Sequence, residues 1–168
     1  QGGLVDWNAF SRALLAHRAP LPEYQGLDHE DVDTYLRECE EYITQHNVAD
    51  GLRTRTMQKG LRGEADRWWT MYRSMNVEWG RYQSLLRSRF DSPSIRSNLV
   101  AKLYGAKQQP NESAGTFLQQ KYLLYQRVRP EENEEARISA MINLLRPGLR
   151  KILRLRNIND FSELLTST

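Results

Sequence analysis

The fold is indicated most clearly by residues 61–90, which read LRGEADRWWTMYRSMNVEWGRYQSLLRSRF. Two groups of apolar side chains in this stretch recur at steps of three and four residues, which places each group on one helix face. The groups are Leu61, Ala65, Trp68, Trp69 and Tyr72, then Trp79, Tyr82, Leu86 and Phe90. A turn near Asn76 separates them, so we predict two antiparallel helices. Their register favours a place in the core over base stacking, although adjacent Trp68 and Trp69 cannot both face one core.

The residues before this stretch predict two further helices. Residues 28–46 carry an apolar stripe, follow Asp28 as a candidate N-cap, and have an acidic opposite face. Asp50 and Gly51 break that pattern, after which residues 52–60 fit a short helix.

The first 24 residues form an N-terminal arm with its own apolar pattern. Trp7 and Phe10 begin a helical spacing that ends before Pro20 and Pro22. We therefore expect the arm to be ordered against another surface, with Trp7 and Phe10 as the contact residues.

A boundary is predicted at Asp91-Ser92-Pro93, because proline disfavours helix for the preceding residue but fits a first helical turn. Five helical patterns follow this boundary. The first covers residues 95–103, and the second begins after Asn111 as its candidate cap and runs to residue 128. The others cover residues 131–145, residues 149–155, and a last helix that starts at Asn159 or Asp160. No alternating strand pattern of useful length is present. The sequence thus predicts an all-α protein of about nine helices in two small lobes, residues 25–91 and 92–168, preceded by the arm 1–24.

Composition restricts the class of protein. The chain is 39% hydrophobic and 27% charged, which is typical of globular proteins and unlike disordered or membrane proteins. No apolar run approaches the roughly 18 residues of a membrane span, and the first residues do not resemble a secretion signal. One cysteine, Cys39, excludes an internal disulfide framework and favours a reducing compartment such as the cytoplasm.

The sequence contains no convergent catalytic or metal-binding pattern. His17, His29 and His46 are scattered over the arm and the two ends of one predicted helix. Gly60 and Gly63 are better explained by helix ends than by a phosphate loop, because no strand precedes them. We expect no enzyme activity, no metal site and no cofactor.

Residues 146–156, here called the basic segment, leave two interpretations open. It contains Arg146, Arg150, Lys151, Arg154 and Arg156. Aliphatic residues alternate with these cations at helical spacing, which favours the solvated face of an amphipathic helix. The alternative is weak contact with nucleic-acid phosphates, for which the charge density is sufficient.

Several of these residues resemble a known family. Ala65, Trp68 and Trp69 followed by Trp79, Tyr82 and Phe90 resemble the Gag signature of Ty3/Gypsy retrotransposons. Gln108, Glu112 and Phe117 resemble the major homology region of retroviral and retrotransposon capsids, and Leu144, Pro147, Leu149 and Arg150 resemble a later helix junction of that family. The resemblance covers about residues 27–165. It departs at Lys121, where the family usually has an aromatic residue, and Tyr122 follows one position later.

The resemblance implies a bilobar, capsid-like helical protein that assembles with copies of itself. The family includes retrotransposon Gag proteins and domesticated host proteins of the Arc type. It implies rings made by the N-terminal lobe, dimers made by the C-terminal lobe, and Gln108, Glu112 and Phe117 as structural organisers of the C-terminal lobe. It also implies shells that enclose RNA with help from regions outside these 168 residues, in the cytoplasm and in released capsid-like particles or extracellular vesicles.

Two other functions remain open at this stage. An Arc-like adaptor would bind peptides in an aromatic-lined groove of the N-terminal lobe, which Trp7 and Phe10 of the arm could fill in cis. A nucleic-acid module would use the basic segment, whose binding would weaken steeply with salt.

Overall fold

The computed structural model describes residues 6–16, 19–105 and 107–168, and these residues confirm the all-α prediction. They form ten α-helices and two short 3₁₀-helices, with one isolated parallel bridge between Tyr24 and Leu61 and no strand among the described residues. The contacts divide the chain into two compact units, residues 1–90 and 91–168, each with its own hydrophobic core. None of the helices described is long and apolar enough to cross a membrane.

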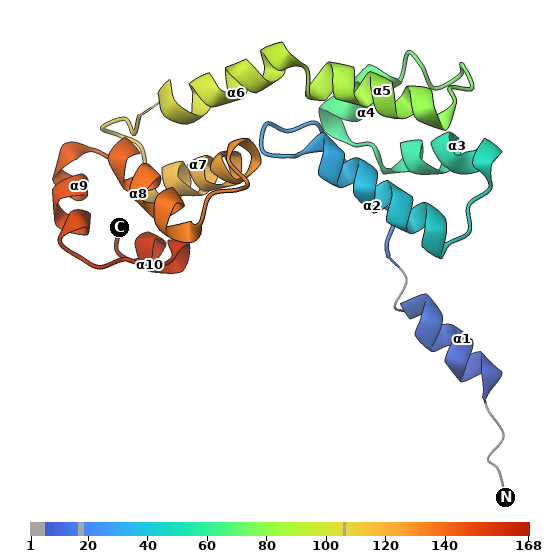
Figure 1. Cartoon of the computed structure of the whole chain (residues 1–168), viewed down its shortest axis with the longest axis horizontal. Helices are drawn as coiled ribbons and strands as arrows, with labels where there is room; N and C mark the ends of the chain where they lie inside the picture. The colour runs from blue at the N-terminus through green and yellow to red at the C-terminus, as the bar shows by residue number, and fades with distance from the viewer. Residues whose placement is uncertain (1–5, 17–18, 106) are drawn as a thin grey trace, which may run out of the picture. The chain divides into compact units, whose positions relative to one another are not determined.

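The first unit is built from helices (Figure 1) that enclose a core rich in aromatic side chains. Its helices after the arm are α2 (Val32–Gln45), η1 (Asp50–Leu52), α3 (Arg53–Met57), η2 (Gln58–Gly60), α4 (Gly63–Trp69) and α5 (Trp79–Phe90). The stripe of α2 packs against that of α5, and the buried hydroxyls of Tyr35 and Tyr82 meet at 2.8 Å between them. Trp69 is fully buried and donates its indole N–H to Gln58, whereas Trp68 is only half-buried.

An extended segment, residues 21–25, completes this core. The Tyr24 N–H donates to the Gly60 carbonyl at 3.1 Å, and the Arg62 N–H donates to the Tyr24 carbonyl at 2.8 Å. Tyr24 is buried and its ring stacks on that of Tyr35. A Cβ at Gly60 would lie 1.9 Å from the Pro22 carbonyl oxygen, so glycine permits this close approach.

The first helix of the chain, α1 (Trp7–Ala16), begins at Asp6, whose carboxylate accepts from the N–H groups of Asn8 and Ala9 at 3.1 Å. Trp7 and Phe10 touch edge to face and are 68% and 50% exposed. Their packing in a groove therefore stays a prediction.

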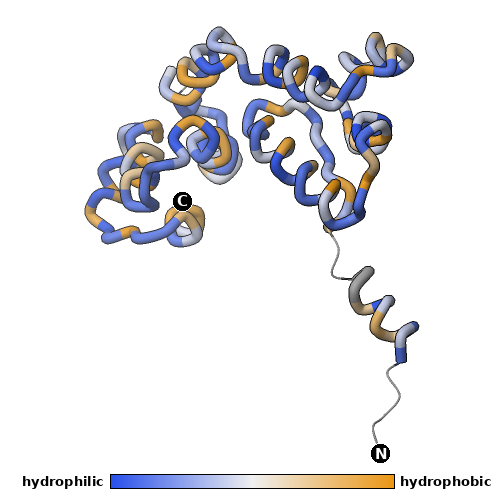
Figure 2. Tube along the Cα trace, turned by 45° about the vertical axis from the view of Figure 1, so that its right-hand side comes forward, coloured by the Kyte–Doolittle hydropathy of each residue, from blue (hydrophilic) through white to orange (hydrophobic). Residues whose placement is uncertain are grey.

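The second unit contains α6 (Pro93–Gly105), α7 (Ala114–Val128), α8 (Glu134–Leu144), α9 (Pro147–Arg154) and α10 (Phe161–Thr166). Helix α7 lies between α6 and α8, and α8 also contacts α9 and α10. Figure 2 shows apolar positions recurring along the helices of both units and alternating with hydrophilic ones. Each helix of the second unit therefore buries one side, as expected for small helical units.

Two predicted caps are wrong. Asp28 lies in a turn, and Asp31 caps α2 instead through the Asp33 N–H. The reason is Glu30, whose carboxylate accepts from the N–H groups of Gln25 and Leu27 and holds this part of the chain outside the helix.

The cap of α7 is Ser113 rather than Asn111. The Glu112 N–H donates to the Gln109 carbonyl and closes a turn that delays the start of the helix.

Candidate functional site

Gln108 is the first of the three residues that resemble the major homology region. Its side chain is buried, donates from Nε2 to the Glu112 carbonyl at 3.1 Å, and accepts at Oε1 from the Arg146 backbone N–H at 3.1 Å. Its own N–H donates to the Leu144 carbonyl at 3.2 Å. One glutamine thus ties the loop before α7 to the junction between α8 and α9.

Glu112 lies in the same loop as Gln108, and Phe117 lies in the helix that follows this loop. The Glu112 carboxylate accepts from the Gln109 N–H at 3.1 Å, which closes the loop around Gln108. Phe117, in the first turn of α7, is buried in the core of the second unit. The structure brings Gln108 and Glu112 together in one loop and places Phe117 in the adjoining core, while their role as organisers stays a prediction.

Lys121 replaces the aromatic residue that the family resemblance leads one to expect. It is buried, and its ammonium donates to the Lys102 carbonyl and, at 3.1 Å, to the Leu103 carbonyl near the end of α6. The ammonium also lies 5.6 Å from the centre of the Phe117 ring. Burial lowers the pKa of Lys121, and the nearby Glu112 carboxylate opposes that change. Sequence reasoning missed this role, because a lysine gives no signal for burial.

The basic segment forms α9 and its two ends. Arg146 is the N-cap residue, Arg150, Lys151 and Arg154 lie within the helix, and Arg156 follows it. The Arg146 guanidinium donates to the Pro110 carbonyl at 3.0 Å, and Arg154 donates to the side-chain oxygen of Asn143. The structure brings these five cations onto one helix and its flanks.

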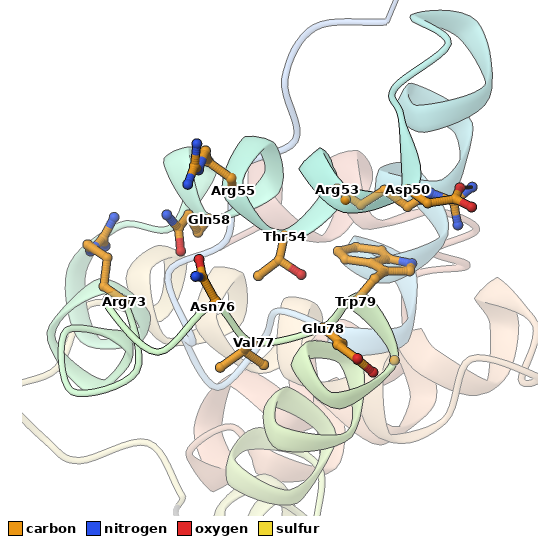
Figure 3. A pocket seen from close by; sticks show the side chains of 12 residues that line it. Asp50, Arg53, Thr54, Arg55, Gln58, Arg73, Asn76, Val77, Glu78 and Trp79 are labelled. Atoms are coloured by element: carbon orange, nitrogen blue, oxygen red, sulfur yellow. Dashed lines mark ion pairs between the residues drawn. The ribbon is translucent and has the colours of Figure 1, made fainter.

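The first unit contains a pocket that the sequence did not predict (Figure 3). Its volume is about 770 Å³, and it lies between residues 50–58 and residues 73–80. Arg53 pairs with Asp50 at 2.9 Å on its rim, and Trp79 lines it while donating its indole N–H to Glu40 at 2.8 Å. In Figure 3 the side chains of Thr54 from α3 and Gln58 from η2 extend toward the loop that carries Asn76.

The histidines do not converge on this pocket. His46 ends α2, where its ring stacks on Tyr42 and its Nε2 lies 3.0 Å from the Ala19 carbonyl oxygen. His29 is exposed before the start of α2, and His17 lies outside the described residues.

Comparison with known proteins gives consistent sequence and structural matches. No family model matches the chain. The human and mouse proteins named activity-regulated cytoskeleton-associated protein are each 23% identical over 135 residues, which is 80% of this chain and 34% of theirs. The chain thus spans about a third of the length of the curated relatives it matches.

Two solved structures share the fold over most of the chain. The dArc2 capsid matches with a TM-score of 0.52 and 21% identity, over 88% of this chain and 92% of the matched one. The dArc1 capsid matches with a TM-score of 0.52 and 22% identity, over 88% and 90%. The chain is thus similar in sequence to the activity-regulated cytoskeleton-associated proteins and shares the all-helical fold of the dArc1 and dArc2 capsid structures.

Proposed function

We propose that this chain is a capsid structural protein that assembles with copies of itself into rings or shells, which enclose RNA with help from regions outside these 168 residues. The observation that carries the proposal is the fold shared with two capsid structures over 88% of the chain. In the proposed assembly the first unit acts as an N-terminal lobe that forms rings, and the second acts as a C-terminal lobe that forms dimers. Assembly begins in the cytoplasm and yields particles that the cell can release.

Exposed apolar side chains support self-association. In the first unit Met71 and Met75 are 59% and 64% exposed, and in the second Val100 and Leu123 are 37% and 43% exposed. Identical units with complementary patches close into rings or shells by symmetry. Each unit therefore offers apolar surface to a neighbouring copy.

Light scattering coupled to size separation, over a range of protein and salt concentrations, tests assembly directly, with electron microscopy of large species. We expect dimers and larger rings or shells, and a strict monomer under every condition would contradict the proposal. Met71→Glu with Met75→Glu should remove rings and retain dimers. Val100→Glu with Leu123→Glu should remove dimers.

The matched control is Ser139→Glu with Ser162→Glu, which adds the same two charges at exposed positions of α8 and α10. Assembly should survive in this control. RNA recovered from shells after nuclease treatment then tests enclosure separately.

A second candidate function is peptide binding by the first unit, as an adaptor of the Arc type. It is favoured by the extended segment 21–25, which pairs with Leu61 in the way that bound peptides pair with a strand. Because Tyr24 makes both hydrogen bonds of this pairing, deleting residues 1–25 should expose the surface around Leu61 to hydrogen exchange and allow an added peptide to protect it. Unchanged exchange after the deletion would rule out a groove occupied in cis.

A further inference from the structure

The basic segment differs from the rest of the chain in its charge balance. Five of its eleven residues are cationic, and no acidic residue occurs from Arg146 until Asp160. Elsewhere the arginines are commonly neutralised by acidic partners. Those in ion pairs are Arg53, Arg62, Arg67, Arg73, Arg87, Arg89, Arg96, Arg127 and Arg137.

No cation of the basic segment has an acidic partner within the described part of the chain. The hydrogen bonds of its side chains go to neutral acceptors, the Pro110 carbonyl for Arg146 and the Asn143 amide for Arg154. Arg146, Lys151, Arg154 and Arg156 are exposed, and Arg150 is half-buried. The segment therefore presents a concentrated positive charge to solvent.

Helix stability accounts for only part of this arrangement, because Lys151 and Arg154 lie in the last turn, where the macrodipole favours positive charge. Arg146 is the N-cap and Arg150 lies in the first turn, where the helix macrodipole disfavours positive charge. The apolar side of α9 is already used, since Leu153 is fully buried and Leu149 packs against the core of the second unit. The cations occupy the side that remains.

The segment is also held in a fixed conformation. Gln108 accepts from the Arg146 backbone N–H, Pro147 begins the helix, and Leu153 anchors its far end in the core. Cations on a backbone that is already folded lose less conformational entropy on binding an anion than cations on a mobile tail would.

We propose that the basic segment binds the phosphate backbone of RNA without sequence preference. This inference rests on the proposed function, because it assigns a cargo-contacting surface to the capsid protein. Cations alone are sufficient for phosphate contacts. The segment contains no aromatic residue on which a base could stack, so its contacts are to the backbone rather than to the bases.

A membrane surface fits the segment less well. Ile152 and Leu155 are 52% and 85% exposed, but they are only two aliphatic side chains at the end of the helix. A helix that lies in a membrane interface inserts a continuous apolar face, and the apolar face of α9 points into the core of its own unit.

The inference predicts a measurable salt dependence. Five phosphate contacts on a single strand give a slope of log K against log salt of about −3.5, which is roughly a 100-fold loss of affinity for a fourfold rise in salt. Replacing three of the five cations should reduce the magnitude of the slope by about 2.

The experiment is fluorescence anisotropy of a labelled oligouridine RNA of about 20 nucleotides with the full chain, over a salt series. The test variant is Arg150→Gln, Lys151→Gln, Arg154→Gln. The control is Arg55→Gln, Lys59→Gln, Arg81→Gln, which removes the same charge from exposed positions of the first unit that form no ion pair with a described residue. We expect the test variant to lose at least tenfold in affinity with a shallower slope, and the control to lose less than threefold.

Three results would overturn the inference: no binding of the unchanged chain at low salt, equal losses in the two variants, or an unchanged slope in the test variant. Binding of anionic phosphatidylserine vesicles that depends on the basic segment, without RNA binding, would instead assign the surface to lipid. Should the triple variant fail to fold by circular dichroism, Lys151→Gln alone keeps the test valid, because the Lys151 side chain is exposed and forms no hydrogen bond or ion pair with a described residue.

The outcome separates this inference from the proposed function. Light scattering of the test variant without RNA should still detect assemblies. Assembly with unchanged RNA affinity would remove the inference and leave the capsid function. RNA binding that depends on the basic segment, by a protein that stays monomeric, would support the inference and contradict the capsid function.

Discussion

Gln108 and Arg146 are 38 residues apart in the sequence, yet the Arg146 backbone N–H donates to the Gln108 side-chain oxygen at 3.1 Å. The same amide group donates to the Glu112 carbonyl. A single buried side chain therefore closes the loop before α7 and fixes the start of α9.

Gln108→Ala should destabilise the second unit by about 1–3 kcal/mol, because it leaves a donor and an acceptor without partners. Urea unfolding followed by circular dichroism measures the loss, and hydrogen exchange at the Arg146 amide locates it. All four tryptophans, Trp7, Trp68, Trp69 and Trp79, lie in the first unit, so their fluorescence transition should not move. Gln120→Ala, an exposed change on α7, is the control, and equal effects of the two substitutions would refute the role of Gln108.

Gly60→Ala should destabilise the first unit by about 1–3 kcal/mol, because the added methyl group collides with the backbone of the extended segment. Its Cβ would meet the Pro22 carbonyl oxygen at 1.9 Å. Tryptophan fluorescence during urea unfolding reports the change. Gly51→Ala is the matched control, since nothing lies within 4 Å of a Cβ there. A Gly60→Ala protein as stable as this control would mean that the segment does not lie against Gly60.

The first unit should lose stability in alkali because of Cys39 and Tyr35. Burial raises the pKa of the Cys39 thiol from 9.0 to about 12 and also raises that of the Tyr35 hydroxyl above 10.0. A raised folded-state pKa means that the contribution to stability is complete below the unfolded value and is lost as pH rises above it. The thiol alone should cost about 1.4 kcal/mol per pH unit above its unfolded pKa, until the folded pKa is approached.

Unfolding of the reduced protein at a series of pH values from roughly 8 to 10.5 measures this slope. Cys39→Ala should be less stable at neutral pH, because it opens a cavity, but its stability should fall less steeply above pH 9. Parallel pH profiles for the two proteins would show that the thiol is not the titrating group.

Lys121→Ala should destabilise the second unit by about 1–3 kcal/mol, because the ammonium no longer satisfies the carbonyl groups near the end of α6 and the buried stem leaves a void. Lys121→Met should recover part of the loss by filling that volume. Hydrogen exchange of the last turn of α6 should increase in both variants. Two variants as stable as the unchanged protein would place the Lys121 side chain in solvent.

The positions of the helices could be predicted from the sequence, because hydrophobic periodicity is a local property. The spacing of Tyr82, Leu86 and Phe90 requires only a 3.6-residue repeat to indicate a helix, and α5 spans Trp79–Phe90. Pro93 indicated the beginning of α6 by its own stereochemistry. The resemblance to capsid proteins directed attention to Gln108 and Glu112, but not to the atoms that they bind.

Tertiary structure decided which residues meet. Trp68 and Trp69 have nearly the same local signal, but only Trp69 is fully buried, because its indole reaches Gln58 from the neighbouring helix. Asp31 rather than Asp28 caps α2 because Glu30 holds the preceding backbone.

By itself the sequence determined an all-helical chain with a strong positive charge near its end. The neutral partners of Arg146 and Arg154, like the bond from Arg146 to Gln108, depend on the path of the chain through space. Periodicity and propensity extend over a few residues, whereas these contacts join residues that the sequence separates by up to 38 positions. Only the folded core brings such residues to hydrogen-bonding distance.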